Sequence, residues 1–382
     1  MAGKTVLILG GGTGGLVAAN RLRRALDKEN RIVLVDRSPY YTLQPSLSWV
    51  MLGQRSLPRI TRDLRDLRKK AIEVKTAEIA SLDLANKKVQ LAKEELAYDY
   101  LIIALGAAYS DAEVPGLNRA WTYYHPDGAD GIHEELPLFS SGRIVLAAAA
   151  LPYKCPPSLY EGAFLLDNYF RKRRLRANID IRIYTPEATP LTQYGAEAGE
   201  RVARLLQSRD IGFSGGLQMK SVDHDKRLIE FQIGEQAPFD MLIAAPVHVL
   251  PPVLTTTGLA GADGWLAVDR ETLLTAAADV YAIGDCNSVP IADGQTLPKS
   301  GVFAHGEAEV VARNLTSEIV GRDPIWAFGG QGACFMETGG GRGAYLSGNF
   351  YTDPPQVTMG GPNRLMHWAK VGSERVWLWR WF

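Results

Sequence analysis

A glycine-rich turn between an aliphatic run and a helical pattern constrains this chain more than any other feature. Residues 5–9 read TVLIL, residues 10–15 read GGGTGG, and a helical pattern, LVAANRLRRAL, begins at Leu16. The turn fits G-x-G-x-x-G in the strand-to-helix context that the motif requires. Its glycines let the backbone approach a pyrophosphate at the N-terminus of the helix. The candidate cofactor-binding residues in this turn are Gly10, Gly12, Thr13 and Gly15.

An acidic residue completes the motif. Asp36 follows a second aliphatic run, residues 32–35, and lies about 20 residues beyond Gly15. A carboxylate at that distance accepts hydrogen bonds from the adenosine ribose. The opening therefore predicts a βαβ unit with parallel strands that binds a dinucleotide, and the motif alone does not distinguish FAD from NAD.

Two later segments decide between these cofactors. Residues 98–107 read YDYLIIALGA, and residues 279–286 read DVYAIGDC. They resemble the two further FAD signatures of the flavoprotein disulfide reductases and their relatives, in which an aspartate matching Asp285 binds the ribitol side of FAD. The resemblance implies FAD as the cofactor. It adds as candidate binding residues Arg37, Ala104, Gly106, Gly284 and Asp285.

Short buried-strand candidates recur along the chain at residues 101–105, 144–146, 179–184, 241–245 and 280–283. We predict an α/β fold with two tandem Rossmann-like dinucleotide-binding domains, the second inserted in the first, and a small C-terminal membrane or quinone region. The expected boundaries are 1–110 for the first part of the FAD-binding domain and 111–258 for the second Rossmann-like domain. Residues 259–324 return to the FAD-binding domain, and residues 325–382 form the C-terminal region.

The turn that should open the second domain lacks glycine. Residues 147–157 read AAAALPYKCPP. Alanine adds a Cβ where a pyrophosphate needs backbone contact, and proline removes amide donors. NAD(P)H is therefore not the expected electron donor. Close redox cysteine pairs in the first domain are also excluded, because no cysteine precedes Cys155.

From residue 154 the chain reads KCPPSLYEGAF, and here it resembles the sulfide:quinone oxidoreductase family and the flavin subunit of flavocytochrome c sulfide dehydrogenase. Further matching stretches are DR at 36–37, PSL at 45–47, PKSG at 298–301 and GACF at 332–335. The resemblance implies a redox pair of Cys155 and Cys334, with Cys334 nearer the flavin and Cys155 carrying sulfur. It also implies an acid/base role for Glu161 and a position near the flavin for Lys299.

Thiol chemistry gives these residues a coherent reaction. Sulfide can attack a disulfide or polysulfide sulfur and leave a persulfide on one cysteine and a thiolate on the other, and the thiolate can pass electrons to a flavin. Glu161 also has a simpler interpretation as an acid that complements the helix N-terminus. Cys286 is expected to be a small buried hydrophobe, and His125 resembles a histidine near the sulfide site, although lone loop histidines are usually solvated.

The C-terminal stretch 364–382 contains four of the eight tryptophans, interspersed with Arg and Lys. It predicts an amphipathic helix in the lipid headgroup layer, hence peripheral association with the cytoplasmic membrane, beside a quinone entrance. A dimer interface is the alternative, and a homo-oligomer stays open. No export signal is expected at the N-terminus.

Lys+Arg and Asp+Glu number 42 each, so no net charge attracts nucleic acid. The expected partners are sulfide, a membrane quinone and the lipid bilayer surface. We therefore predict FAD-dependent oxidation of sulfide with electrons passed to quinone. Three alternatives remain: an NADH:quinone oxidoreductase, a soluble flavocytochrome c-type flavin subunit, and a redox-sensing flavoprotein without turnover.

Overall fold

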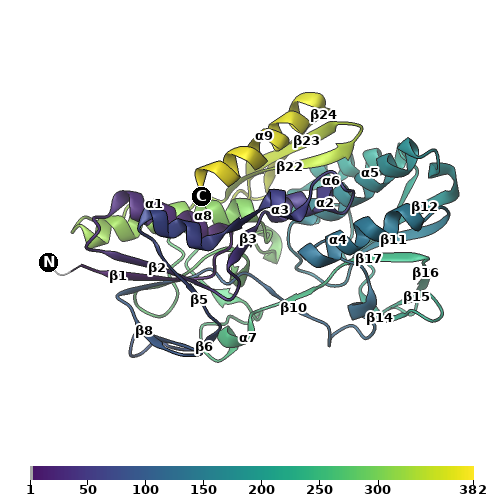
Figure 1. Ribbon diagram of the computed structural model, residues 1–382. Coiled ribbons are helices and arrows are strands. Elements are labelled where there is room, and N and C mark those ends of the chain that lie inside the picture. The colour runs from purple at the N-terminus through teal and green to yellow at the C-terminus, as the bar shows by residue number, and fades with distance from the viewer. Residues whose placement is uncertain (1–2) are drawn as a thin grey trace.

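A five-stranded parallel sheet forms the N-terminal part of the computed structural model, which describes residues 3–382 (Figure 1). The strand order is β20, β9, β1, β2, β5, and pairing of β20 with β9 returns the chain to this sheet after a long excursion. Helices α1 and α8 pack together on one face of the sheet. The elements are β1 (Thr5–Leu9), α1 (Thr13–Ala25), β2 (Arg31–Asp36), β5 (Glu73–Thr76), β9 (Tyr100–Ile103), β20 (Val280–Ala282) and α8 (Gly301–Ile319).

The opposite face of this sheet is covered by a small antiparallel sheet and by α7. Val89 and Leu91 of that small sheet share a buried apolar cluster with Leu7 and Leu9 of β1. Because β1 is apolar on both faces, it reads as a continuous hydrophobic run, as central parallel strands do. The covering elements are β6 (Ile79–Asp83), β7 (Lys88–Leu91), β8 (Glu95–Ala97), α7 (Pro252–Thr255) and the short pair β19 (Leu266–Ala267) and β21 (Asn287–Ser288).

A second parallel sheet, in the order β13, β12, β11, β17, forms the other half of the molecule. Figure 1 shows it at the right, with α4, α5 and α6 around it. Its elements are α4 (Pro126–Glu135), β11 (Gly142–Ala148), α5 (Pro156–Lys172), β12 (Ile179–Tyr184), α6 (Ala196–Gln207), β13 (Ile211–Ser214) and β17 (Met241–Ala245). An antiparallel sheet covers one face: β14 (Met219–Asp223), β15 (Leu228–Phe231) and β16 (Gln236–Pro238).

The chain passes between the two parallel sheets twice, and each passage contains a short strand. These strands, β10 (Ala108–Ser110) and β18 (Val247–Val249), pair with each other in antiparallel orientation. A further segment after β2 packs beside α1 and α9. It contains β3 (Tyr40–Thr42), α2 (Leu47–Val50), α3 (Leu57–Ile60), β4 (Thr61–Asp63) and the 3-10 helix η2 (Leu64–Lys70).

The C-terminal region is an antiparallel meander followed by a helix, drawn in yellow in Figure 1. Strand β22 contacts α5 of the second half and α8 of the first, so the meander bridges the two parallel sheets. Its elements are β22 (Gln331–Gly339), β23 (Arg342–Asn349), β24 (Gln356–Asn363) and α9 (Arg364–Arg380). Trp381, just beyond α9, is buried, and its carbonyl accepts a hydrogen bond from Asn20 of α1 at 3.2 Å.

The predicted α/β class is confirmed, and β1, β12 and β17 have the bounds that the sequence predicts. Strand β9 ends two residues earlier than expected. Its ladder stops after the Ala104 amide, which donates to the Leu9 carbonyl at 2.7 Å, and Gly106 then turns the chain with a φ of 66°.

Candidate active site

The carboxyl ends of β1, β2 and β9 meet at one edge of the first sheet and form a cradle. The Gly11 amide donates to Asp36 Oδ2 at 2.6 Å, and the Ser38 amide donates to Asp36 Oδ1 at 2.8 Å. These bonds fix the Asp36 carboxylate beside the glycine turn. Gly10, at a φ of 104°, lies against Ala104, because a Cβ there would be 2.2 Å from the Ala104 carbonyl oxygen. The predicted residues of β1, β2 and β9 are thus brought together, whereas Arg37 is exposed.

The glycines of the turn have two different tasks. A Cβ on Gly15 would lie 1.9 Å from the Gly10 carbonyl oxygen, so this glycine is needed for helix α1 to follow the strand closely. A Cβ on Gly12 would meet no atom within 4 Å. Gly12 therefore borders open space at the N-terminus of α1, the place where a pyrophosphate is held in such turns.

We predict different outcomes for Gly12→Val and Gly15→Val. Gly12→Val should fold normally but bind FAD more weakly by roughly tenfold or more, because its side chain displaces charge-assisted contacts to the pyrophosphate. Gly15→Val should instead lose soluble, folded protein. Flavin absorbance per protein and the thermal midpoint with excess FAD would test both. Full FAD occupancy in Gly12→Val would contradict the assigned cradle.

The end of β20 supplies the second part of the cradle. The buried Asp285 Oδ1 has no hydrogen-bond partner among residues 3–382, and burial raises the pKa of this carboxyl. An unpaired buried acceptor fits a hydroxyl donor from a ribityl chain. Lys299 donates to the Asp285 carbonyl at 2.8 Å and to the Asn287 carbonyl at 3.1 Å, with its Nζ 3.3 Å from the Trp265 ring centroid. Burial lowers the pKa of Lys299 to about 8.

A buried carboxyl that the sequence analysis missed lies behind this loop. Glu307 of α8 accepts hydrogen bonds from the Gly284 amide at 2.5 Å and from Asn287 Nδ2 at 3.0 Å. Burial raises the pKa of Glu307 to about 7. In sequence it lies within GEAEVV, which gives no signal for a buried acid, so only its place on the inner face of α8 reveals it.

Glu307 predicts a pH dependence of stability. Because its pKa is higher in the folded chain than the ordinary 4.5, folding takes up a proton between these values, and stability falls as pH rises from about 4.5 to about 7. The full effect is about 3 kcal/mol. Glu307→Gln should remove this dependence. Urea unfolding of the FAD-loaded wild type and variant at several pH values measures this, because the difference between their free energies of unfolding isolates the contribution of Glu307. If the two free energies change with pH in parallel, the prediction is contradicted.

The two predicted redox cysteines are partly buried and lie in one cluster beside this cradle. Cys155, at a φ of 51°, precedes α5, and its amide donates to the Lys299 carbonyl at 2.7 Å. Burial raises the pKa of the Cys155 thiol to about 12, with a further contribution from Glu161. Burial, the charge of Cys155 and that of Glu161 raise the pKa of Cys334 on β22. Both thiols are free.

Cys286 lies elsewhere. Its Sγ contacts the carbonyls of Ile103 and Ile283 at 3.5 and 3.3 Å, within the apolar cluster of the first sheet. This agrees with the expected structural role of Cys286.

Glu161 joins α5, α2, β22 and α9. Its carboxylate accepts from Ser48 Oγ at 2.5 Å, from the Glu337 amide at 2.9 Å and from Lys370 Nζ at 2.6 and 2.7 Å. The Lys370 and Glu161 side chains are only 8% and 6% exposed, so they form a buried ion pair. The simpler interpretation of Glu161 as an acid that complements the helix N-terminus does not account for its ion pair with Lys370.

The Lys370 partner of Glu161 was not identified from sequence. Lys370 belongs to the tail that reads as a membrane-surface helix, where a lysine is expected to be solvated. The same inner face of α9 brings His367 to Glu337, with Nδ1 2.9 Å from Glu337 Oε2. Burial raises the pKa of Glu337.

A cationic and aromatic cluster flanks Cys155 on the other side. Lys154 Nζ lies 4.7 Å from the Tyr109 ring centroid, and the Lys154 amide donates to His248 Nε2 at 3.3 Å. The His125 ring packs edge-on against Tyr109 at 4.5 Å. Burial and the Lys154 charge lower the pKa values of both histidines, that of His248 to about 3. His125 thus lies near the loop of Lys154 and Cys155.

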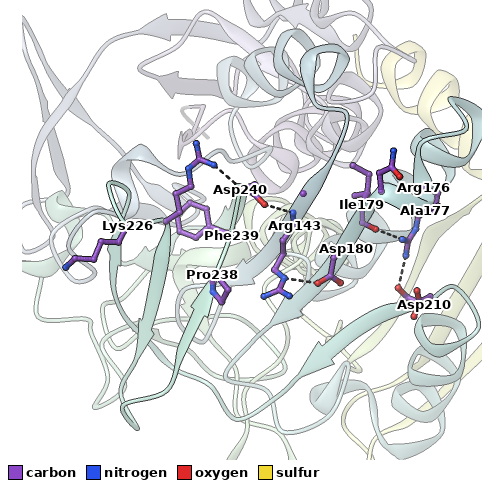
Figure 2. Close-up of a pocket in the computed structure, with 13 residues that line it drawn as sticks. Arg143, Arg176, Ala177, Ile179, Asp180, Asp210, Lys226, Pro238, Phe239 and Asp240 are labelled. Atoms are coloured by element: carbon purple, nitrogen blue, oxygen red, sulfur yellow. Dashed lines mark hydrogen bonds and ion pairs between the residues drawn. The ribbon is translucent and has the colours of Figure 1, made fainter.

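A surface hollow of about 770 Å³ lies far from this cluster along the second sheet. It opens at the amino ends of β11 and β12, whereas Cys155 follows the carboxyl end of β11. Figure 2 shows Arg143 paired with Asp180, and Arg143 Nε lies 2.7 Å from the Asp180 carboxylate. Arg227 Nη1 likewise lies 3.0 Å from Asp240 Oδ1. The hollow is therefore not part of the candidate active site.

Several known proteins are similar to this chain in sequence and in fold. The pyridine nucleotide-disulphide oxidoreductase family matches residues 4–146. The chain is 26% identical to the mitochondrial sulfide:quinone oxidoreductase of Mus musculus over 92% of its own length and 79% of that protein. It is 25% identical to the alternative NAD(P)H-ubiquinone oxidoreductase C1 of Arabidopsis thaliana, over 94% of this chain and 75% of that one. The crystal structure of the sulfide:quinone oxidoreductase from Aquifex aeolicus matches with a TM-score of 0.88 and 22% identity, covering 99% of this chain and 91% of that one.

The matched family and these relatives support an FAD-dependent oxidoreductase, and the fold is that of the Aquifex aeolicus enzyme. Over most of its length the chain is similar to sulfide:quinone oxidoreductases.

Proposed function

We propose that this protein binds FAD and oxidises sulfide to zero-valent sulfur through Cys155 and Cys334, with a membrane quinone as electron acceptor. The observation that carries the proposal is the partly buried thiol cluster next to the cradle. Cys155 is hydrogen-bonded to Lys299, and Lys299 is hydrogen-bonded to the loop of Asp285, so the thiols and the flavin site share one loop system. We assign residues 1–110 and 259–324 to an FAD-binding Rossmann-like domain and residues 111–258 to a second one inserted in it. Residues 325–382 form the C-terminal region.

The reaction begins on the oxidised cysteine pair. The sulfur of HS⁻ attacks the Cys155 sulfur of the disulfide, which makes a Cys155 persulfide and releases Cys334 as a thiolate. A new bond between the Cys334 sulfur and the outer sulfur of the persulfide joins the two cysteines through a three-sulfur bridge and releases two electrons and one proton. FAD held by the Gly10–Gly15 turn and Asp285 would supply the two-electron acceptor, and the electrons would pass on to a quinone, which takes up two protons. Glu161, next to both thiols, is the proposed acceptor of the proton.

The thiol cluster is arranged to control charge. Burial disfavours thiolates at both cysteines, so the negative charge released in the first step needs a nearby cation. Lys370 lowers the pKa of both thiols and is held in place by Glu161. We assign to Lys370 the stabilisation of the transient thiolate. Lys154, adjacent to Cys155, is placed to attract the sulfide anion.

The start of α5 argues against NAD(P)H as the electron donor, the alternative suggested by the Arabidopsis relative. A nicotinamide dinucleotide needs free amide donors at this helix N-terminus. Here the Cys155 amide is bonded to the Lys299 carbonyl, Pro156 and Pro157 have no N–H, and the Ser158 amide is bonded to the Cys155 carbonyl at 2.7 Å. The second domain therefore offers thiols where relatives using NAD(P)H offer a pyrophosphate cradle.

Peripheral membrane association is proposed from one face of α9. Leu365, Trp368, Val376 and Trp379 are 69%, 64%, 54% and 81% exposed, and their spacing places them along one side of the helix. Apolar and aromatic residues in such a stripe enter the headgroup layer of a bilayer. In the part of the chain that the structure describes, none of the helices is both long and apolar enough to span a membrane.

Steady-state assays test the proposed function. Purified protein with sulfide should reduce a water-soluble quinone, and the same protein with NADH should not. If the protein with sulfide rapidly reduces cytochrome c but not quinone, the flavocytochrome-type alternative is favoured instead. Absence of turnover with every donor would favour a redox-sensing flavoprotein.

A further inference from the structure

A groove of about 500 Å³ lies between α9 and the segment that contains α3, β4 and η2. The side opposite α9 is formed by Arg59, Arg62, Asp66 and Lys69. On the α9 side, Leu378, Trp379 and Phe382 form an apolar wall next to Arg375 and Glu374. Because α9 also carries the exposed apolar stripe, this groove opens beside the proposed membrane-contacting face.

The acidic residues of the groove are already neutralised. Glu374 accepts from Arg55 at 2.8 Å and from Ser46 Oγ at 2.7 Å, and Asp66 is paired with Lys69 at 2.6 Å. Among the side chains that the structure describes, Arg59, Arg62 and Arg375 have no carboxylate partner within ion-pair distance. The groove therefore presents a net positive charge.

Arg62 is partly held in place. Its Nη1 donates to the carbonyls of Arg59 and Thr61 at 3.2 and 2.8 Å, which leaves its other guanidinium donors free. Guanidinium groups bind phosphate oxygens in pairs of parallel hydrogen bonds. Arg62 thus gives the groove an ordered hydrogen-bond donor, and the side chains of Arg59 and Arg375 line the groove beside it.

We propose that this groove binds the phosphate of an anionic phospholipid, with the lipid chains continuing along Leu378 and Trp379 into the bilayer. The inference rests on the membrane association in the proposed function and deepens it by naming the lipid class. Charge complementarity favours an anionic lipid over a zwitterionic one or an uncharged quinone. The apolar wall distinguishes the site from a simple basic surface, because it receives glycerol and acyl carbons while the arginines receive the phosphate.

Vesicle flotation of the full, FAD-loaded protein tests the proposal. Wild type should bind phosphatidylcholine vesicles containing phosphatidylglycerol more tightly than vesicles of phosphatidylcholine alone. An arginine near the membrane surface contributes about fivefold to such partitioning, so Arg59→Gln/Arg375→Gln should lose roughly tenfold or more of its binding to the anionic vesicles. Binding to phosphatidylcholine should be unchanged.

Arg380→Gln is the matched control. Arg380 is an exposed arginine on the same helix, but it packs over the Trp381 ring and does not line the groove. The groove predicts a distinctly larger loss for Arg375→Gln than for Arg380→Gln. Equal losses would mean diffuse surface charge and would overturn the proposal.

A soluble lipid gives a second readout. Short-chain dihexanoyl-phosphatidylglycerol, below its micelle concentration, should bind wild type saturably in calorimetry, with one site. Dihexanoyl-phosphatidylcholine and the Arg59→Gln/Arg375→Gln variant with either lipid should give no saturable signal. Equal binding of both lipids would overturn the inference. A wild type that sediments as a dimer while the variant sediments as a monomer would also overturn it, because the groove would then be a contact between two copies of the chain.

Failure of the proposed function would look different. Sulfide-driven reduction of a water-soluble quinone without vesicles should be the same in wild type and in Arg59→Gln/Arg375→Gln. A wild type that lacks this activity but shows the lipid selectivity would refute the sulfide reaction alone. A wild type that has the activity without lipid selectivity would refute the groove alone.

Discussion

Cys155→Ser and Cys334→Ser should each lower the rate of flavin bleaching by sulfide by roughly a thousandfold or more, while FAD stays bound. Each substitution removes the partner that the other cysteine needs to form a disulfide or a sulfur bridge, so both should cost about the same. Serine is similar in size, and neither thiol contacts the Gly10–Gly15 turn, so the FAD content should not change. Stopped-flow absorbance under anaerobic conditions measures the rate.

Cys286→Ser is the matched control for this experiment. Its thiol is fully buried in the apolar cluster of the first sheet, where its Sγ contacts the carbonyls of Ile103 and Ile283. It should bleach at nearly the wild-type rate even if its thermal midpoint falls. Wild-type bleaching in Cys155→Ser or Cys334→Ser would refute the thiol mechanism, and loss of bleaching in Cys286→Ser alone would move the reacting sulfur to the first sheet.

Lys370→Met should destabilise the folded protein by about 3–5 kcal/mol, because it leaves the Glu161 carboxylate buried without its cation. Met has a similar length, so packing against Trp49, whose ring centroid lies 4.8 Å from Lys370 Nζ, should change little. The double variant Glu161→Gln/Lys370→Met removes both charges and should recover a large part of the loss. Urea unfolding with FAD in constant excess gives the three free energies.

Lys220→Met provides the comparison for a surface pair. Lys220 Nζ lies 2.6 Å from Glu230, the same distance as in the buried pair, but its side chain is 52% exposed. Exposed pairs contribute little, so this variant should unfold close to wild type. Equal small effects for Lys370→Met and Lys220→Met would show that Glu161 is not held as a buried carboxylate.

The cofactor cradle follows from the sequence because its parts are local. The turn at Gly10–Gly15 and the segments that end β2, β9 and β20 are each short motifs, and parallel strands bring their carboxyl ends to the same edge. The strand bounds of β1 and β12 follow for the same reason. The expectation that Cys155 and Cys334 lie close together came from the family resemblance, because no local sequence pattern links two residues so far apart in the chain.

The contacts of the C-terminal helix could not be predicted in this way. The tail has four tryptophans, and sequence alone assigns all of them to a membrane surface, yet Trp381 is buried and Trp377 is half-buried. A helix of this composition can turn either face inward, and the choice depends on partners 209 residues away, as for Lys370 and Glu161. Pairing of a buried acid with a distant lysine leaves no periodic pattern in the sequence, so only the folded structure reveals the role of Lys370. The same is true of Glu307, whose hydrogen bonds go to Gly284 and Asn287.

Anaerobic titration of the FAD-loaded protein with sulfide and, separately, with NADH tests the central claim most directly, when each is followed by addition of a short-chain quinone. We predict that sulfide bleaches the flavin, that quinone restores its absorbance, and that NADH leaves it unchanged. Bleaching by NADH alone would mean that the alanine- and proline-rich turn before α5 accepts a nicotinamide after all, and it would contradict the assignment of Cys155 and Cys334 as the entry point of electrons.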